Sequence, residues 1–259
     1  MIVAANDFYS GKALIEYGEY AQQECNLIYN IIRPGDVVLD VGANIGALAV
    51  PMMRRVEPLG RVLAFEPQPM IARLLAANLA LNSQGGNSHA LNCAIGNDHG
   101  FVDFPVQDYE KGNFQNFGRV SMEQTDVGVP LRRLDEFVLP NVAFIKIDVE
   151  GWETAVLQGA HELIARCRPI MLIENDRVEE GPTLMEELEA LAYRCWWAMT
   201  PLYSPDNFNK RQDNMYGVAA SMDMLCIPTE KEQTLAERLV LRPANIDTLD
   251  EIYRSVQLI

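Results

Sequence analysis

The stretch VVLDVGANIGALAV, residues 37–50, has the pattern of a buried strand, a tight turn and a helix. Its first five residues are nearly all apolar, as in a parallel strand that helices cover on both faces. Gly42 allows a sharp turn where a side chain would clash, and Gly46 allows a helix to pack closely on the strand. This stretch therefore predicts the first strand–turn–helix unit of a parallel α/β sheet.

The same alternation continues on both sides of this unit. Strands are predicted at 37–41, 61–66, 89–92, 142–148, 169–174, 193–199 and 223–228, and helices at 19–33, 45–56, 69–82, 152–166 and 183–192. The last strand follows a long loop rather than a helix, so we expect it to be antiparallel, at or near an edge. The prediction is a Rossmann-like, doubly wound α/β fold with a mostly parallel seven-stranded sheet and helices on both faces.

Several features flank or interrupt this pattern. Residues 101–106 alternate like a half-exposed strand, and Pro51 is expected to bend the helix at 45–56. We expect an N-terminal helical extension at 1–34, a main domain at 35–228, and a C-terminal helix and tail at 229–259 packed on that domain.

Composition narrows the possible partners. The formal net charge is −15 and the 21 basic residues are scattered, so a surface for nucleic acid or anionic lipid is not expected. No run of about 18 apolar residues suggests a membrane span, and the N-terminus does not look like a secretory signal. The five cysteines form no CxxC pair, which favours a reducing compartment. We expect a cytoplasmic protein and leave its oligomeric state open.

Acidic residues follow the first two predicted strands. Asp40 lies at the end of the first, and Glu66 ends the second, 24 residues after Gly42, where a carboxylate can bind both ribose hydroxyls of an adenosine. A dinucleotide site would have a second glycine where Asn44 stands, and amides aimed at a pyrophosphate. S-adenosylmethionine has no phosphate and carries a sulfonium and an ammonium, so it suits an acidic strand end better. An NAD(P)-dependent oxidoreductase and a non-catalytic ligand-binding relative remain alternatives.

A resemblance supports this interpretation. The chain resembles the FkbM family of class I S-adenosylmethionine-dependent methyltransferases in VVLDVGANIGALAVPMMRRVEPLGRVLAFEPQP, ALNCAIGNDHG, IKIDVEGWETAVLQGA and RPIMLIEND. The resemblance implies O-methylation of a hydroxyl on a sugar or other natural product, with residues 35–228 as the methyltransferase domain. It also implies cofactor contacts by Asp40, Gly42, Asn44, Gly46 and Glu66, and adenine stacking near Cys93 and Ala94.

The stretch FIKIDVEGWE, residues 144–153, places Lys146, Asp148 and Glu150 along one side of a buried strand and its end. Burying charge there costs several kcal/mol unless it is compensated. Methyl transfer to an oxygen needs a group that aligns the acceptor and removes its proton. We therefore predict catalytic roles for Asp148 and Glu150, with Lys146 pairing with a carboxylate. The alternative is that Asp148 or Glu150 only caps the next helix, with Glu153 adding charge to its positive end.

A metal is a further possibility at this edge. Asp148, Glu174 and Asn175 have a spacing that resembles the magnesium site of catechol-type O-methyltransferases, and Mg²⁺ would acidify a bound hydroxyl. For the small-molecule acceptor we expect a pocket formed by the loops at 115–119 and 201–217, with Asn116, Phe117, Trp197 and Asn207 as candidates. Trp196 and Trp197 are adjacent in a strand and so point to opposite faces, one into the core and one towards the pocket.

Overall fold

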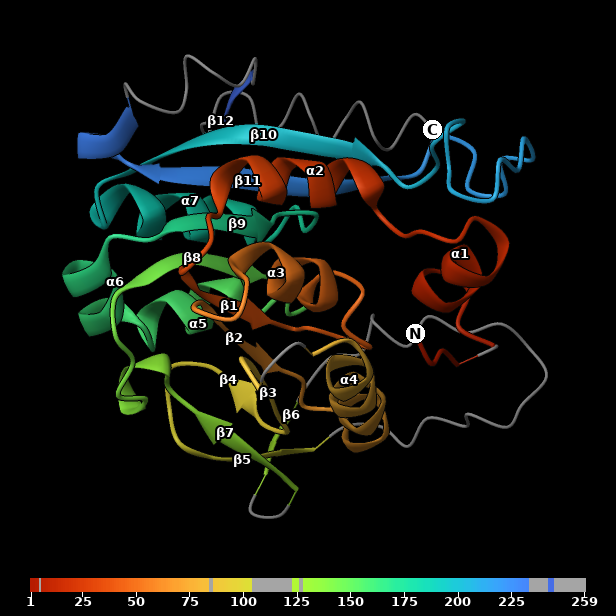
Figure 1. Cartoon of the computed structure of the whole chain (residues 1–259). Coiled ribbons are helices and arrows are strands. Elements are labelled where there is room, and N and C mark those ends of the chain that lie inside the picture. Colours follow the sequence, from red (N-terminus) through yellow and green to blue (C-terminus); the bar gives the residue numbers. More distant parts are fainter. Residues whose placement is uncertain (5, 84–85, 104–122, 126–127, 233–241, 245–259) are drawn as a thin grey trace.

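The computed structural model describes residues 1–4, 6–83, 86–103, 123–125, 128–232 and 242–244. Within them lies an eight-stranded sheet with the order β12-β10-β11-β9-β8-β1-β2-β3 (Figure 1). Its strands are β1 (Val37–Val41), β2 (Arg61–Phe65), β3 (Ser88–Leu91), β8 (Val142–Ile147), β9 (Ile170–Glu174), β10 (Tyr193–Pro201), β11 (Ala220–Pro228) and β12 (Arg242–Ala244).

Strand directions confirm the predicted sheet. The pairs from β3 through β2, β1 and β8 to β9 are parallel, whereas β11 runs antiparallel to both of its neighbours, β9 and β10. The seven predicted strands are all present. The short strand β12 adds an eighth, antiparallel to β10, that the sequence pattern did not indicate.

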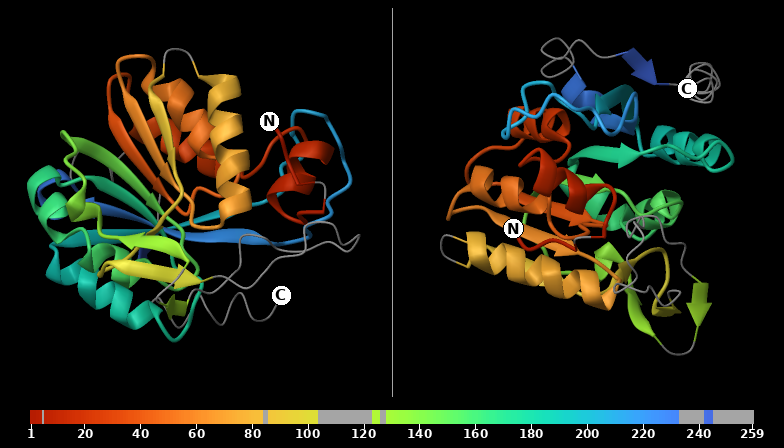
Figure 2. Two further views of the ribbon diagram at one scale, coloured as in Figure 1. Left: turned by 90° about the horizontal axis from the view of Figure 1, so that it is seen from below. Right: turned by 90° about the vertical axis from the view of Figure 1, so that its right-hand side faces the viewer.

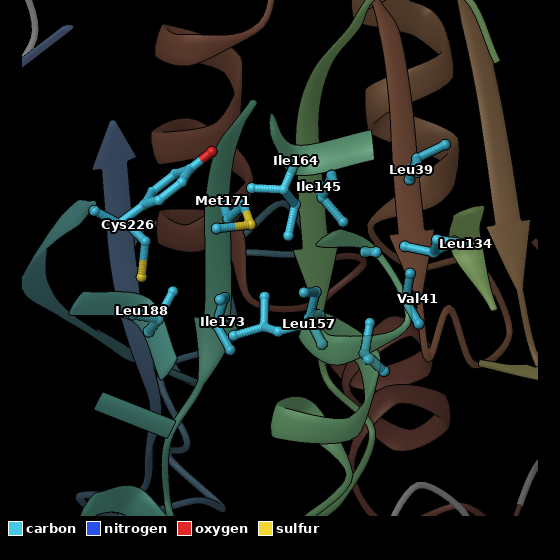
Figure 3. Packing of buried hydrophobic residues seen from close by; sticks show 14 of the residues in the cluster. Leu39, Val41, Leu134, Ile145, Leu157, Ile164, Met171, Ile173, Leu188 and Cys226 are labelled. Atoms are coloured by element: carbon cyan, nitrogen blue, oxygen red, sulfur yellow. The ribbon is translucent and has the colours of Figure 1, made fainter. Parts of the chain in front are cut away.

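Helices cover both faces of the sheet, as predicted. On one face lie α2 (Gln22–Ile31), α3 (Ala49–Val56) and α4 (Pro69–Asn82), whose apolar residues pack on Val38 and Phe144. On the other lie α5 (Glu153–Gln158), α6 (His161–Cys167) and α7 (Gly181–Ala190), which pack on Leu39 and Ile145 (Figure 3). Neighbouring residues of one strand thus enter different core clusters, because side chains alternate between the faces of a strand.

A second, smaller sheet packs beside the main one, with the order β4-β7-β5-β6. Its strands are β4 (Ala94–Ile95), β5 (Gly100–Asp103), β6 (Glu123–Thr125) and β7 (Val129–Arg132), and the short helical turn η1 (Leu134–Glu136) follows β7. The described part of the predicted strand 101–106 belongs to β5, and residues 104–106 lie outside the described residues.

The helix predicted at 19–33 is shorter at both ends, the one predicted at 183–192 begins two residues earlier, and two others differ more. The helix predicted at 45–56 begins only at Ala49, so Pro51 falls in its first turn, where a missing N–H leaves no hydrogen bond unmade. The helix predicted at 152–166 is two helices, α5 and α6, separated at Gly159. A Cβ at Gly159 would lie 1.9 Å from the carbonyl oxygen of Gly96, so the close approach of another segment accompanies the break.

The ends of the chain are only partly described. The N-terminal extension contains α1 (Ser10–Glu16) and α2, and the described residues after Pro228 form a helical turn, η2 (Thr229–Lys231), and β12. Most of the predicted C-terminal helix lies outside the described residues, and the domain boundaries stay a prediction. Among the helices in the described ranges, none is long and apolar enough to cross a lipid bilayer.

Candidate active site

A cavity of about 250 Å³ lies at the carboxyl ends of β1, β2, β8 and β9. It brings together most of the site residues predicted from sequence: Asp40, Gly42, Asn44, Glu66, Cys93, Ala94, Lys146, Asp148, Glu150 and Glu174. Four other predicted residues in the described part of the chain do not line it: Gly46, Asn175, Trp197 and Asn207. The spatial arrangement on which the sequence argument depended, with the acidic strand ends around one cavity, is therefore present.

The glycine turn after β1 sets the closest backbone approach in the site. Gly42 has φ +86°, in the left-handed region, and a Cβ there would lie 1.7 Å from the carbonyl oxygen of Asp148. The Gly42 N–H donates to the carbonyl of Phe65, 3.0 Å away, which ties the turn to β2. Gly46 instead faces α4, where a Cβ would meet the Leu75 side chain at 2.9 Å. Its contact is one of helix packing rather than with the cavity.

Glu66 is held in place by the backbone of the same turn. Its carboxylate accepts hydrogen bonds from the N–H groups of Asn44, at 2.9 Å, and Gln68, at 2.8 Å. The residue is 4% exposed, and burial raises the pKa of its carboxyl to about 7 despite these two bonds. Beside it, Cys93 and Ala94 are buried and contribute an apolar wall, as an adenine ring requires.

Asp40 is a buried carboxylate with no hydrogen-bond donor among the described residues. It is 3% exposed and lines the cavity. Burial raises the pKa of its carboxyl to about 7, although the positive charge of Lys146 opposes this shift. A buried acceptor without a donor costs free energy, which a ligand with positively charged N–H groups would recover.

Lys146 is the centre of a buried ion cluster, which explains the charges in the stretch 144–153. Its Nζ lies 2.9 Å from Asp223 on β11, 3.3 Å from Asp148 and 3.5 Å from Glu24 on α2. Burial alone would lower the pKa of the Lys146 ammonium, but the surrounding carboxylates raise it above its usual value. Lys146 therefore stays positively charged and positions Asp148, whose side chain is 38% exposed.

Glu150 and Glu153 make different contacts at the start of α5. Glu153 accepts hydrogen bonds from the N–H groups of Val149 and Gly151, each at 3.1 Å, so it satisfies the donors that Asp148 or Glu150 would bind as a cap. Glu150 has φ +57° and pairs with Arg177 at 2.6 Å. Burial, with the nearby charge of Asp148, raises the pKa of the Glu150 carboxyl to about 7.

The structure brings three carboxylates together where a metal was predicted, but not the predicted set. Oxygens of Asp148, Glu150 and Glu174 all lie within 4.8 Å of one another. Burial and the charge of Asp148 raise the pKa of the Glu174 carboxyl well above its usual value. Asn175 points the other way: its amide donates to the sulfur of Met224 at 3.4 Å. Glu150 thus stands where Asn175 was expected.

The predicted acceptor residues are not brought to the cavity. Asn116 and Phe117 lie outside the described residues. Trp197 is buried in the core cluster that includes Leu188, and Trp196 is buried in the cluster on the other face, so both indoles are core. Asn207 is fully buried and holds its own loop, with its amide donating to the carbonyls of Ser204 and Arg211.

The N-terminal segment supplies a wall of the cavity that sequence reasoning missed. Its contributions are Asp7, Tyr9, Ser10, Tyr20 and Glu24. Figure 2 shows this segment beside the loop after β10. Two tyrosines join them: the Tyr17 hydroxyl donates to the Asp213 carbonyl at 2.8 Å, and the Tyr216 hydroxyl donates to the Tyr9 carbonyl at 2.7 Å. One signal was available in the sequence, because Glu24 interrupts the apolar face formed by Ala21, Cys25 and Ile28.

This strand order, with an antiparallel strand between the last two parallel ones, and the acidic ends of β1 and β2 define a class I S-adenosylmethionine-dependent methyltransferase. The model of the Methyltransferase FkbM domain matches residues 40–195, and the chain belongs to this family.

Individual relatives agree with this assignment. The chain is 29% identical to methyltransferase sdnD of Sordaria araneosa over 238 residues, covering 76% of this chain and 89% of that protein. It is 36% identical to the 31-O-demethyl-FK506 methyltransferase FkbM of Streptomyces tacrolimicus over 92 residues, 35% of this chain and 34% of that one.

Solved structures share the fold. A precorrin-6y C5,15-methyltransferase from Geobacter metallireducens has a TM-score of 0.50 at 13% identity, covering 80% of this chain and 89% of that one. A SAM-dependent O-methyltransferase from Thermotoga maritima also has a TM-score of 0.50, at 16% identity, and the match covers 80% of this chain and 65% of that one.

Proposed function

We propose that this methyltransferase acts on a hydroxyl oxygen of a small-molecule acceptor, a sugar or another natural product. The similar FkbM protein of Streptomyces tacrolimicus carries O-methylation in its name, which supports the choice of oxygen. The observation that carries most of the proposal is the charge of the cavity. Eight carboxylates line it, against one ammonium, that of Lys146, among the described residues.

The residues present fit S-adenosylmethionine. The Glu66 carboxylate has remaining lone pairs for ribose hydroxyls, and Asp40 needs a cationic donor. The turn at Gly42 has no basic side chain for a pyrophosphate, and the acidic lining would repel one, which disfavours the NAD(P)-dependent alternative. When bound, S-adenosylmethionine supplies a methyl group on a sulfonium, and its loss leaves a neutral thioether.

Asp148 is the group best placed to take the acceptor proton. It follows β8 directly, lies between the cofactor side of the cavity and the acidic residues after β9, and its side chain is the most exposed of the Lys146 cluster. Its carboxylate would accept the hydroxyl hydrogen bond and orient the oxygen for in-line attack. Lys146 holds that carboxylate in place through an ion pair of 3.3 Å. Glu150, paired with Arg177, lies beside Asp148 and would bind a second polar group of the acceptor.

Magnesium assistance remains a prediction with a revised ligand set. Three carboxylates with hard oxygen donors suit Mg²⁺. Arg177 competes for the same Glu150 carboxylate, so a metal would have to displace that ion pair. The ligands would be Asp148, Glu150 and Glu174, without Asn175.

Calorimetry and methyl transfer test the proposal together. We expect S-adenosylhomocysteine to bind the purified protein and NADH not to bind. Incubation with unlabelled S-adenosylmethionine and fractionated metabolites should give a product that is 14 daltons heavier and is methylated on oxygen by NMR.

Asp148→Asn should keep S-adenosylhomocysteine binding and lose at least about 100-fold in transfer rate, whereas Asp206→Asn, on an exposed acid, should change neither. Binding of NADH but not S-adenosylhomocysteine would refute the proposal. Cofactor binding with no product in any fraction would favour the non-catalytic alternative.

A further inference from the structure

Glu24 is a cavity-lining acid outside the segment matched by the family model, which begins at residue 40. It lies on α2, whose Ile28 and Ile31 are buried in the core against the sheet. The helix is therefore fixed, and the side chain projects towards the ends of β1 and β8. The Glu24 residue is only 3% exposed.

The charge balance around Lys146 does not account for Glu24. Asp223 and Asp148 already lie closer to the Lys146 ammonium, at 2.9 and 3.3 Å, than Glu24 does at 3.5 Å. Either of the two nearer carboxylates is enough to neutralise one lysine, so Glu24 adds negative charge beyond what the lysine needs. Excess buried charge of one sign is costly unless a further cation enters the site.

The hydrogen bonding of Glu24 is also incomplete. Its Oε1 atom is buried and lies 3.5 Å from the Lys146 Nζ, so it has a long ion pair but no hydrogen bond from the described residues. Burial raises the pKa of its carboxyl to about 8, with the charge of Asp223 adding to the shift and that of Asp40 contributing less. Asp40, which lines the same cavity, has no donor among these residues either. Two buried carboxylates therefore line one cavity, and neither accepts a hydrogen bond from the described residues.

We propose that Glu24 is a second cofactor-binding carboxylate, which together with Asp40 holds the α-ammonium group of S-adenosylmethionine. An ammonium offers three N–H donors and one positive charge, which matches two carboxylates with unused lone pairs. The ribose end of the cofactor is held separately by Glu66 on β2. The inference rests on the proposed function, and it makes the N-terminal extension part of the cofactor site.

The test uses three adenosine thioethers that differ in one group each. S-adenosylhomocysteine has the ammonium and the carboxylate, its decarboxylated analogue keeps only the ammonium, and 5′-methylthioadenosine lacks both. We expect Glu24→Gln to weaken the first two at least 10-fold by calorimetry and the third less than 2-fold. Asp40→Asn should show the same pattern.

The matched control is Glu16→Gln, which removes an acid of the same N-terminal segment that pairs with Arg211 and does not line the cavity. It should leave all three affinities unchanged. Thermal unfolding checks that each variant is folded. If Glu24→Gln does not fold, Glu24→Asp, which keeps the charge on a shorter side chain, replaces it and should weaken the same two ligands.

Equal losses for all three ligands, or no loss for any, would overturn the role of Glu24 and leave it a partner of Lys146 only. A wild-type protein that binds none of the three would instead refute the proposed function. The two failures are therefore distinguishable.

Discussion

Gly42→Ala tests whether the turn after β1 sets the geometry of the site. The new Cβ would lie 1.7 Å from the Asp148 carbonyl oxygen, so that backbone would have to move by more than about 1 Å to restore ordinary contact. The methyl donor and the proposed base would then be misplaced relative to each other, and a misplacement of this size typically lowers the reaction rate about 100-fold. We expect S-adenosylhomocysteine affinity and methyl transfer each to fall about that much.

Gly35→Ala is the matched control for this substitution. Gly35 has φ +89°, close to the +86° of Gly42, but a Cβ there would meet nothing within 4 Å. Both variants therefore carry the backbone strain, about 1 kcal/mol in thermal or denaturant unfolding, and only Gly42→Ala adds the contact with Asp148. If the two variants bind S-adenosylhomocysteine equally well, the close approach at Gly42 does not control the site, and the reasoning is refuted.

Four further predictions concern the charged groups of the site. In the ligand-free protein, the carboxyls of Asp40 and Glu66 have raised pKa values of about 7. Protonation of these two carboxyls therefore stabilises the folded state. Their contribution to stability is present below the unfolded pKa of about 4 and is lost as pH rises through 7, which urea unfolding between pH 5 and 8 should show as a falling trend. Cationic S-adenosylmethionine prefers the ionised forms, so calorimetry should find its affinity roughly 10-fold higher at pH 8 than at pH 6, with proton release on binding; an affinity that falls with pH would contradict the assignment. Lys146→Met should cost about 3 to 5 kcal/mol of unfolding free energy by leaving Asp223 buried and unpaired, and adding Asp223→Asn should recover part of it; an unchanged stability would show that the cluster is not held by charge. If a divalent ion assists, EDTA should abolish transfer and Mg²⁺ restore it in the wild type, and Glu174→Gln should raise the Mg²⁺ concentration needed at least 10-fold; transfer that is indifferent to EDTA would remove the metal from the mechanism.

The fold and the gathering of acidic strand ends around one cavity, the proposed cofactor half of the site, could be predicted from local patterns. Each strand that ends in the cavity is an apolar run, and the ends of parallel strands meet at one edge, so Asp40 and Glu66 could be placed near each other without coordinates. Gly42 was recognisable because only a residue without a Cβ tolerates its turn. These features depend on a few neighbouring residues, and the sequence contains them directly.

The acceptor half depended on details that a pattern does not contain. Glu174 and Asn175 are adjacent at the end of β9, and adjacent side chains of an extended chain point in opposite directions, so only one faces the cavity. Trp196 and Trp197 obey the same rule, but helices cover both faces at β10, and both indoles became core. Glu24 is 122 residues from Lys146 in the chain, so no local pattern pairs them.

The contact between β1 and β8 joins the two halves of the site through the backbone. The Asp148 N–H donates to the Val41 carbonyl at 2.9 Å, and its own carbonyl packs against Gly42. The main chain that carries the proposed base is thus fixed on both sides by the turn that carries the proposed cofactor residues. The distance between the methyl donor and the main chain of Asp148 then depends on the register of the sheet rather than on side-chain rotamers. Glu150 is held instead by its ion pair with Arg177, so we expect changes at that pair to alter the choice of acceptor without disturbing cofactor binding.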